Sequence, residues 1–389
     1  MDSDAILHLF DWRFRDILHA IPGIAADGFG AIQISPPQLS IDTEDWWGRY
    51  QPIDHTRIEG PLGSERELRD LIGKAHECNP PLKVIIDVVF NHMAESCPQR
   101  QVLRYPRFGP EHFHVQAAID WRSVESIRTG WVGYGPDLPD LRTEHPYVRS
   151  EARKYIALLL DCGADGFRLD AVKHIEPEFF DEVLRDLPPA LIVYGEYILQ
   201  PGHKPVMEQY LRNMRLMDFA LLETMAKAFE IGGDMRMLLD PASQDQALPD
   251  HQGIAFVTNH DLELGEVGGF GLPADSMDLG HVYTITRPES IPLIWKEHRY
   301  NPVVKACIKL RQLSRMHGRE IVLDNDRVLA WRFGDQGAAI MNASRKAINL
   351  PIADLGLRDN IAINMLTGSL VEREFVVRPR RPLLLWIQC

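Results

Sequence analysis

The chain has 389 residues, of which 45% are hydrophobic and 25% charged, so it can bury a large core and exceeds one average domain. Its formal net charge of −13 argues against a nucleic-acid partner or an anionic membrane surface. A neutral substrate is compatible with this acidity, although the charge alone does not identify one.

Four apolar, β-branched segments along the chain each carry polar residues at their carboxyl ends. They span residues 84–92, 166–174, 191–196 and 254–261. Each pattern predicts a buried parallel strand that delivers polar groups where it ends. The polar residues are Asp87, Asn91 and His92 in the first segment, Arg168, Asp170, Lys173 and His174 in the second, Glu196 in the third, and His260 and Asp261 in the fourth. One such strand is commonplace, but four in series are hard to obtain by chance.

The spacing of these segments predicts a barrel of alternating strands and helices. Asp170 and Glu196 are separated by about one βα unit, and Glu196 and Asp261 by about two. We expect the intervening strand at 215–221 and the last strand at 291–295, which completes eight. Residues 93–145, rich in Pro, Gly, His and aromatic residues, read as an excursion from the third strand. After a predicted helix near 301–316, short alternating segments with turns near 324–326, 334–335 and 367–368 predict an antiparallel β module.

The four segments resemble, in their usual order, the signature regions of the α-amylase family of retaining glycoside hydrolases (glycoside hydrolase family 13). Further similarity lies in Ile-Leu-His-Leu-Phe-Asp-Trp at 6–12, the stretches 28–37 and 46–53, Leu-Pro-Asp-Leu at 138–141 and Tyr-Val-Arg-Ser at 147–150. The resemblance covers about residues 5 to 300 and is greatest to the animal and actinomycete type.

The resemblance implies a (β/α)8 TIM barrel with a short B-domain insertion after strand 3 and a C-terminal antiparallel β-sandwich domain. We expect the catalytic barrel at 1–92 and 146–315. The short domain B would be 93–145, and the C-terminal β domain 316–389.

Barrel enzymes place their chemistry at the carboxyl ends of the strands, so the four segments are expected to meet in one cleft. We assign Asp170 as the nucleophile, because Arg168 projects to the same side of its strand and would keep it ionised. Glu196 follows an apolar strand and lacks an adjacent cation, so we expect burial and neighbouring carboxylates to raise its pKa, and we assign it as the general acid and then base. By the resemblance, Asp261 binds sugar hydroxyls and stabilises the transition state.

The resemblance also implies a set of substrate contacts. Tyr50 would be the aromatic platform for the sugar at the cleavage point, with Trp46, Trp47 and Gln51 beside it. His92 and His260 would donate hydrogen bonds to the same sugar. Lys173 and His174 would lie on the leaving-group side. Structural alternatives stay open: Trp46 as a plug of the barrel mouth, either histidine as a neutral core residue, and Lys173 as a solvated helix start.

Calcium is the structural cofactor that the resemblance implies. Its expected ligands are the Asn91 side chain, the Asp140 carboxylate and the His174 main-chain carbonyl; the fourth falls in the shortened segment and is not placed. Animal-type amylases also bind chloride, and Arg168 and Asn259 match two of its ligands. The third position, near 293, carries no basic residue, with Lys296 the nearest, so we do not expect chloride.

The predicted function is endo-acting hydrolysis of internal α-1,4-glucosidic bonds in starch, glycogen or maltodextrins, with retention of configuration. The alternative within the same family is a maltooligosaccharide-forming exo-hydrolase or an α-glucan transglycosylase. Tyr197 and Thr258 depart from the usual pattern and keep that alternative open. A catalytically inactive glucan-binding protein would require the loss of one of the three carboxylates, all of which are present.

The expected partner is an α-glucan substrate, with no nucleic acid, no membrane and a monomeric state. Five cysteines are too few and too scattered for a disulfide framework, although Cys78 and Cys97 could pair. No signal peptide opens the chain as given, which with the odd number of cysteines suggests the cytoplasm. Secretion is expected instead if a signal peptide has been removed.

Overall fold

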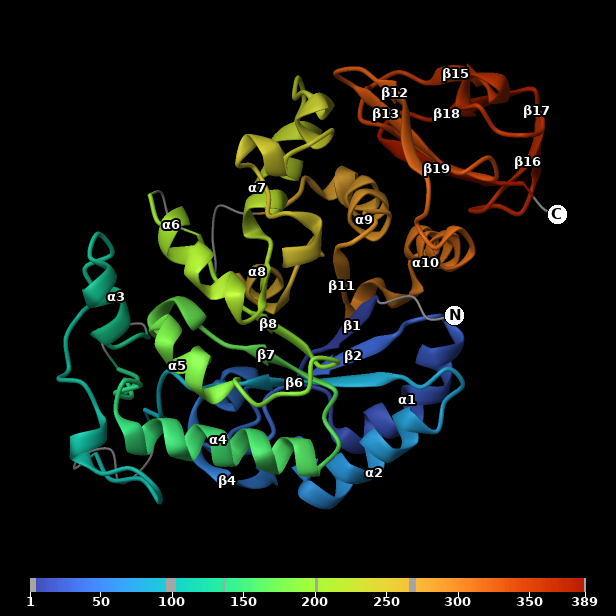
Figure 1. Ribbon diagram of the computed structural model, residues 1–389. Coiled ribbons are helices and arrows are strands. Elements are labelled where there is room, and N and C mark those ends of the chain that lie inside the picture. The colour runs from blue at the N-terminus through green and yellow to red at the C-terminus, as the bar shows by residue number, and fades with distance from the viewer. Residues whose placement is uncertain are drawn as a thin grey trace. The chain divides into compact units, whose positions relative to one another are not determined.

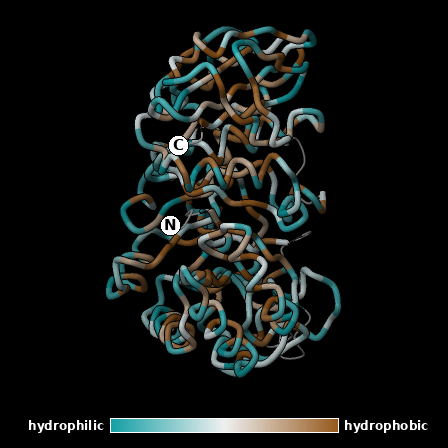
Figure 2. The backbone as a smooth tube through the Cα atoms, turned by 90° about the vertical axis from the view of Figure 1, so that its right-hand side faces the viewer, coloured by the Kyte–Doolittle hydropathy of each residue, from teal (hydrophilic) through white to brown (hydrophobic). Residues whose placement is uncertain are grey.

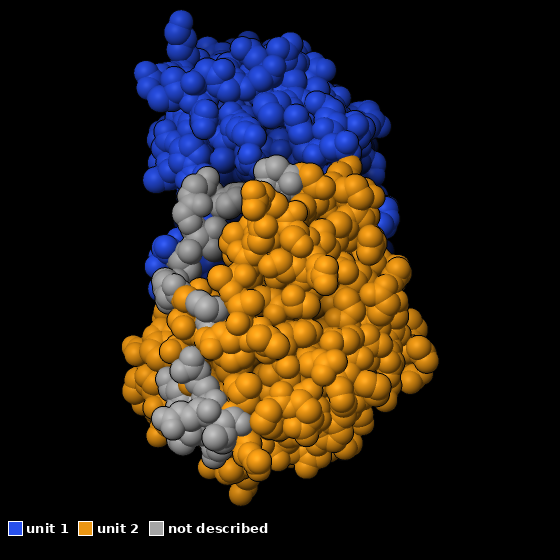
Figure 3. Space-filling model, turned by 90° about the vertical axis from the view of Figure 1, so that its left-hand side faces the viewer, with its two compact units in different colours: residues 1–8, 26–30, 218–389 blue, residues 9–25, 31–217 orange. Residues whose placement is uncertain are grey.

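The computed structural model describes residues 5–95, 103–133, 135, 137–199, 202–265 and 271–387. The chain divides into two compact units, coloured separately in Figure 3. Unit 1 comprises residues 1–8, 26–30 and 218–389, and unit 2 comprises 9–25 and 31–217. The domain boundaries expected from the sequence are a different division of the chain and stay a prediction.

Eight strands form a closed barrel in the order β1-β11-β10-β9-β8-β7-β6-β2; β6, β7 and β8 are labelled in Figure 1. Their bounds are β1 Ile6–Leu9, β2 Ala31–Ile34, β6 Lys83–Val88, β7 Gly166–Leu169, β8 Ile192–Gly195, β9 Arg215–Met217, β10 Gly253–Phe256 and β11 Ile291–Trp295. Most of their residues are buried, as expected for parallel strands covered by helices. The predicted barrel is therefore confirmed.

Parallel pairing fixes the register of the strands inside each unit. In unit 2, Asp87 of β6 lies opposite Arg168 of β7, which lies opposite Tyr194 of β8. In unit 1, β11 pairs with both β1 and β10. Equivalent positions on neighbouring strands point to the same side, so the register of unit 2 lines up Asp87 and Arg168.

Helices alternate with the strands along the chain. The longer ones are α1 Phe14–Ala26, α2 Glu65–His76, α4 Pro146–Asp161, α5 Pro177–Val183, α7 Phe219–Phe229, α9 Met277–Ile285 and α10 Pro302–Ser314. α2 begins with a capping box formed by Ser64 and Glu67, which satisfies free amides at its first turn. Apolar and polar stretches alternate along the tube in Figure 2. No described helix combines the length and apolar character that a membrane crossing would need.

The predicted strand at 215–221 is only partly correct. β9 ends at Met217, and the Asp218 side chain then accepts hydrogen bonds from the amides of Leu221 and Leu248. The first of these bonds caps α7, so residues 219–221 belong to the helix and not to the strand.

The excursion after the third barrel strand has its own small core in unit 2. It contains the short α3 Val124–Thr129 and the 3-10 turn η3 Pro110–His112. Buried residues of the excursion pack against residues of the β3 Gln38–Ser40 and β4 Pro52–Gly60 region; the cluster comprises Ile41, Met93, Ala94, Tyr105, Phe108, Phe113, Leu141 and Val148. The expected insertion after strand 3 is therefore present.

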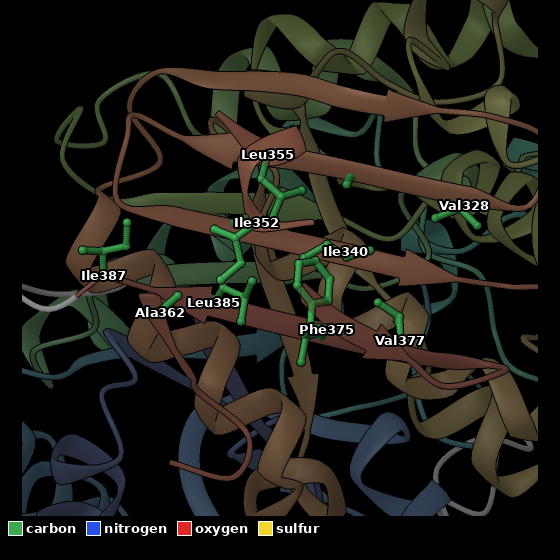
Figure 4. Packing of buried hydrophobic residues seen from close by; sticks show 12 residues of the cluster. Val328, Ile340, Ile352, Leu355, Ala362, Phe375, Val377, Leu385 and Ile387 are labelled. Atoms are coloured by element: carbon green, nitrogen blue, oxygen red, sulfur yellow. The ribbon is translucent and has the colours of Figure 1, made fainter. Parts of the chain in front are cut away.

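The C-terminal part of unit 1 consists of antiparallel sheets. A six-stranded sheet has the order β12-β13-β14-β19-β16-β17, and β15 pairs with β18 in a second sheet. The bounds are β12 Arg319–Asp324, β13 Val328–Phe333, β14 Gly337–Asn342, β15 Ile348–Pro351, β16 Ile361–Asn364, β17 Leu370–Glu372, β18 Glu374–Val377 and β19 Arg381–Trp386. Side chains of both sheets share one apolar cluster, including Ile340, Leu385 and Phe375 (Figure 4). This packing confirms the predicted β-sandwich.

Candidate active site

A buried guanidinium lies at the centre of the candidate site in unit 2. Arg168, whose side chain is 1% exposed, donates from Nη1 to Asp87 Oδ1 at 2.9 Å and to Asp170 Oδ1 at 2.7 Å. Its Nη2 lies 2.8 Å from Glu196 Oε1. Three carboxylates from three neighbouring strands or strand ends therefore share one cation. Buried ion pairs of this kind hold their members in fixed positions.

The electrostatics differ from the expectation drawn from the sequence. Burial raises the pKa of Asp170 to about 7, although the charge of Arg168 acts in the opposite direction. The expected effect of Arg168 on the ionisation of Asp170 is thus outweighed by burial. The statement that Glu196 lacks an adjacent cation is wrong. The register places Arg168 beside Tyr194, two positions before Glu196, so the guanidinium reaches both carboxylates.

Asp87 is held by polar groups of several elements. Besides Arg168, the Tyr50 hydroxyl donates to its Oδ2 at 2.9 Å and the Gln33 amide at 3.5 Å. Tyr194 in turn donates to Gln33 Oε1 at 2.6 Å. Burial raises the pKa of the Asp87 carboxyl. Gln33 and Tyr194 lie inside apolar strands, and no sequence pattern pointed to them as partners of this carboxylate.

The aromatic residues expected as a platform are brought together. Tyr50 is nearly parallel to Phe10 at a ring-centroid distance of 6.4 Å, and Trp46 meets both rings edge-on or tilted. Trp47, next to Trp46 in the short helix η1 Trp46–Tyr50, is 39% exposed. These rings give the site an apolar surface beside the carboxylates.

Gln51 and His92 support the same loop. The Gln51 side chain accepts a hydrogen bond from the Glu95 amide at 3.0 Å. The His92 Nε2 lies 2.9 Å from the Tyr50 carbonyl oxygen. Burial lowers the pKa of His92 to about 4, so its imidazole is neutral near pH 7 and donates to that carbonyl.

A cavity of about 490 Å³ opens beside Glu196, and we call it the Glu196 pocket. Its lining residues are Ala118, Ile119, Trp121, Trp131, Val132, Gly133, Gly135, Ala171, Lys173, His174, Glu196 and Ile198. Lys173 and His174, expected near this place from the sequence, are therefore on its wall. Trp121 and Trp131 were not singled out, although the aromatic content of the segment 93–145 was the signal that could have found them.

Lys173 and His174, the two basic residues of the Glu196 pocket, both make contacts with other residues of the protein. The Lys173 ammonium lies 4.9 Å from the centroid of the Trp121 ring. The His174 Nδ1 lies 2.8 Å from the Ile127 carbonyl oxygen. Burial lowers the pKa of His174 to about 3, so it is a neutral donor to that carbonyl near pH 7.

His260 and Asp261 belong to unit 1 and follow β10. Asn259 caps the short helix α8 His260–Leu264 by accepting from the Leu262 amide at 3.1 Å. The Asn259 amide also donates to Asp261 Oδ2 at 3.2 Å. The His260 Nε2 lies 3.3 Å from Asp261 Oδ1. Local contacts thus fix the orientation of Asp261 at the carboxyl end of a barrel strand.

Comparison with known proteins gives the family. The model of the α-amylase catalytic domain matches residues 17–235. The chain belongs to the α-amylase family. It is 29% identical to an α-amylase of Aeromonas hydrophila over 76% of this chain and 72% of that protein. It is 25% identical to an α-amylase-related protein of Drosophila jambulina over 95% of this chain and 87% of the relative.

Solved α-amylase structures share the fold. A mutant of α-amylase I from Eisenia fetida in complex with maltohexaose superposes with a TM-score of 0.88 at 19% identity, covering 100% of this chain and 98% of that one. An α-amylase from Malbranchea cinnamomea gives a TM-score of 0.77 at 18% identity, covering 98% and 96%. Family membership makes this protein a glycoside hydrolase that acts on α-glucans.

Two buried oxygen atoms mark the place where α-amylases are expected to hold calcium. Asn91 directly precedes His92, which pairs with Asp140 through an isolated antiparallel β-bridge of the main chain. Asn91 Oδ1 and Asp140 Oδ1 are both buried and accept no hydrogen bond within the described part of the chain. Unsatisfied oxygen donors suit a hard cation such as Ca²⁺. The donor set therefore fits calcium, although the described residues hold no cluster of three His, Cys, Asp or Glu side chains that could bind a metal.

The second Asp140 oxygen is already used. The His114 Nδ1 lies 2.6 Å from Asp140 Oδ2. Burial raises the pKa of Asp140 to about 7. Among the described residues, Cys78, Cys162 and Cys307 form no disulfide with one another. Cys97 and Cys389 lie outside the described residues, and so does the expected Cys78–Cys97 pairing.

Proposed function

We propose that the protein is an endo-acting α-amylase that cleaves internal α-1,4-glucosidic bonds with retention of configuration. The observation that carries this proposal is the shared guanidinium of Arg168, which binds Asp170 and Glu196 at 2.7 and 2.8 Å. Two carboxyl groups on one guanidinium are close to each other. Retaining glycosidases need a short carboxyl separation, about 5 Å, whereas inverting enzymes leave room for a water.

The surroundings of the two carboxyl groups support different roles. Glu196 lines a pocket with Lys173 and His174, which suits a general acid that protonates a leaving oxygen. Asp170 is absent from that lining and is followed by Ala171, whose φ of 49° turns the chain sharply. We therefore assign Asp170 as the nucleophile and Glu196 as the general acid and base.

The reaction then proceeds in two displacements. Glu196 protonates the glycosidic oxygen, the bond from C1 to that oxygen breaks, and Asp170 forms an ester with C1. Glu196, now a carboxylate, accepts a proton from water, which attacks C1 and releases Asp170. By the resemblance to the family, we assign Asp261, which follows β10, to the sugar hydroxyls and the oxocarbenium-like transition state.

The remaining substrate contacts are proposed from the resemblance to the α-amylase family. Tyr50 offers its ring to the sugar at the cleavage point, with Trp46, Trp47 and Gln51 in the same loop. We assign His92 and His260 to sugar hydroxyls, as the resemblance implies. Lys173 and His174 face the leaving group.

We also propose calcium as a structural cofactor. Asn91 Oδ1 and Asp140 Oδ1 would supply side-chain oxygens and His174 its main-chain carbonyl. Calcium supplies positive charge that compensates the buried Asp140 carboxylate. Chloride is not expected, since β11 carries Leu293 where a basic ligand would be needed. A monomeric state is also a prediction.

Product analysis tests the proposed function. Amylose, maltoheptaose and maltose are digested separately, and the products and their anomeric form are followed by chromatography and proton NMR. Early mid-length fragments of α configuration from amylose, with maltose untouched, are the expected result. One dominant short product would indicate an exo-hydrolase, products longer than maltoheptaose a transglycosylase, and β-anomers an inverting enzyme. Asp170→Asn and Glu196→Gln are expected to abolish conversion; binding without turnover by the wild type would indicate an inactive glucan-binding protein.

A further inference from the structure

The wall of the Glu196 pocket is dominated by apolar and aromatic side chains. They come from the excursion after β6 and from the segment after β8; they are Ile119, Trp121, Trp131, Val132 and Ile198. The pocket is about 490 Å³, within the range of small-molecule sites. Its ionisable members are Glu196, Lys173 and His174. Much of this surface therefore offers contact area and not hydrogen bonds.

The two basic residues of the pocket are engaged with the protein. The Lys173 ammonium sits over the Trp121 ring, and the His174 Nδ1 is bound to a main-chain carbonyl. The edge of the Trp121 ring also meets His174, at a centroid distance of 5.8 Å. Trp121 thus forms one assembly with both basic residues.

Trp121 is an exposed aromatic residue of this wall. It is 47% exposed, whereas Trp131 is 5% exposed, with its indole N–H donated to the His114 carbonyl at 3.1 Å. A large aromatic ring left open beside a catalytic acid has surface to bury against a flat apolar partner. A second aromatic ring is the partner that such a surface matches best, since stacked or edge-to-face pairs gain energy beyond their buried area.

We propose that the Glu196 pocket is selective for acceptors that carry an aromatic ring, and that the enzyme transfers glucan chains to aryl glucosides. This inference rests on the proposed function. In the transfer, a hydroxyl oxygen of the aryl glucoside attacks C1 of the glycosyl ester. The bond from C1 to Asp170 breaks and the carboxylate is restored. The hydroxyl proton passes to Glu196, and no oxidant, reductant or further reactant is needed.

A matched pair of acceptors tests the proposal. The enzyme is given maltoheptaose with either 4-nitrophenyl β-glucoside or methyl β-glucoside at equal concentration. The quantity measured is the ratio of transfer product to hydrolysis product, by chromatography with mass detection. This ratio reports partitioning of one intermediate, so changes in overall rate cancel. The aryl acceptor is expected to give about a tenfold higher ratio, as one aromatic pair is worth roughly one factor of ten.

Two variants test whether the Glu196 pocket causes the preference for the aryl acceptor. Trp121→Ala is expected to bring the two acceptors to the same ratio. Val115→Ala is the control: Val115 is a fully described, 87% exposed apolar residue of the same excursion that does not line the pocket. It is expected to keep the aryl preference. Equal ratios for both acceptors in the wild type, or an aryl preference that survives Trp121→Ala, would overturn the proposal.

A binding measurement separates this inference from the proposed function. Calorimetry with the wild type and Trp121→Ala is run with the same two glucosides and no donor. Tighter binding of the aryl glucoside that depends on Trp121 supports the pocket assignment even if no α-glucan is hydrolysed, in which case the proposed function alone fails. Active hydrolysis together with equal binding of both glucosides rejects the pocket assignment alone.

Discussion

Arg168 is the cation that three carboxylates of the candidate active site share. Its buried guanidinium contacts Asp87, Asp170 and Glu196. Burial acts to lower the pKa of Arg168, but the charges of these three carboxylates outweigh it and raise that pKa above its usual range. Only the planar, forked guanidinium can meet carboxylates in several directions at once. Arg168 is therefore both a structural cation and a positioning residue for the reaction.

Arg168→Lys is expected to lower kcat by about 10²–10³, the size of effect seen when one preorganised donor is lost. A single ammonium cannot occupy both the Nη1 and Nη2 positions, so Asp170 and Glu196 lose their common anchor. Steady-state kinetics on soluble starch measure the change, with circular dichroism to verify folding. Arg57→Lys, in an exposed pair with Glu59, is the control. A folded Arg168→Lys with wild-type kcat would contradict this role.

The buried imidazole of His281 predicts a measurable effect of pH on stability. Burial, with a further contribution from His298, lowers the pKa of His281 to about 3, and its Nε2 lies 3.0 Å from His298 Nδ1. In the unfolded chain the His281 imidazole takes up a proton near pH 6.5, whereas in the folded chain it stays neutral at that pH. The stability that comes from neutral His281 is present above pH 6.5 and falls as the pH drops toward 3.

His281→Leu is expected to remove the loss of folding stability that His281 causes at low pH. Between pH 6.5 and 4, the unfolding free energy of the wild type should fall relative to that of the variant by about 1.4 kcal/mol per pH unit. Urea unfolding at a series of pH values gives the two curves. His251→Leu, at an exposed position, serves as control and should run parallel to the wild type. Parallel curves for His281→Leu would show that His281 is protonated in the folded protein.

At the scale of elements, the paired strands β7 and β8 leave no space for a side chain at Gly166. A Cβ at Gly166, the first residue of β7, would lie 2.1 Å from the Ile192 carbonyl oxygen. The two strands pair at that position. Since the obstacle is backbone, it cannot move aside without disturbing the strands that carry Arg168 and Glu196. A glycine is therefore required here by close approach.

Gly166→Ala is expected to destabilise the protein by about 1–3 kcal/mol or more, the usual cost of forcing extra volume into a packed interior. Activity should fall with it, because β7 leads into the catalytic segment. Gly60→Ala is a matched control in β4, where an added Cβ meets nothing within 4 Å. Thermal unfolding followed by circular dichroism compares the two. Equal midpoints for both variants would refute the steric argument.

Sequence reasoning succeeded where the residue pattern of a single strand was enough for the prediction. Apolar, β-branched runs located the barrel strands, and alternation along β7 placed Arg168 with Asp170. It failed where side chains from separate elements meet. The Arg168–Glu196 contact depends on the register of β7 against β8, and the end of β9 on the capping preference of Asp218. The Trp121–Lys173 contact joins an irregular segment to a strand end, for which no periodicity exists.

At the scale of the whole molecule, calcium is expected to stabilise the fold. A ligand that binds only the folded state at a hundred times its Kd adds about 2.7 kcal/mol. Removal with EDTA should therefore lower the thermal midpoint, and added Ca²⁺ should restore it. The readout is thermal unfolding, which does not depend on catalysis.

Asp140→Asn tests the ligand assignment, since it keeps the shape of the side chain but removes the charge that calcium would compensate. The variant is expected to have nearly the same midpoint with Ca²⁺ and with EDTA. Asp120→Asn, an exposed aspartate of the same excursion, should respond as the wild type does. A wild-type midpoint that is the same in Ca²⁺ and in EDTA would contradict the calcium proposal.

The pairing of β1 with β11 has a consequence for how the chain is made. Ile6 lies opposite Leu293, so two strands that pair in unit 1 lie far apart along the chain. Contacts of such long sequence separation form late and slow folding. The pairing of β1 with β11 is therefore expected to be a late step of folding, which cannot begin before β11 has been synthesised.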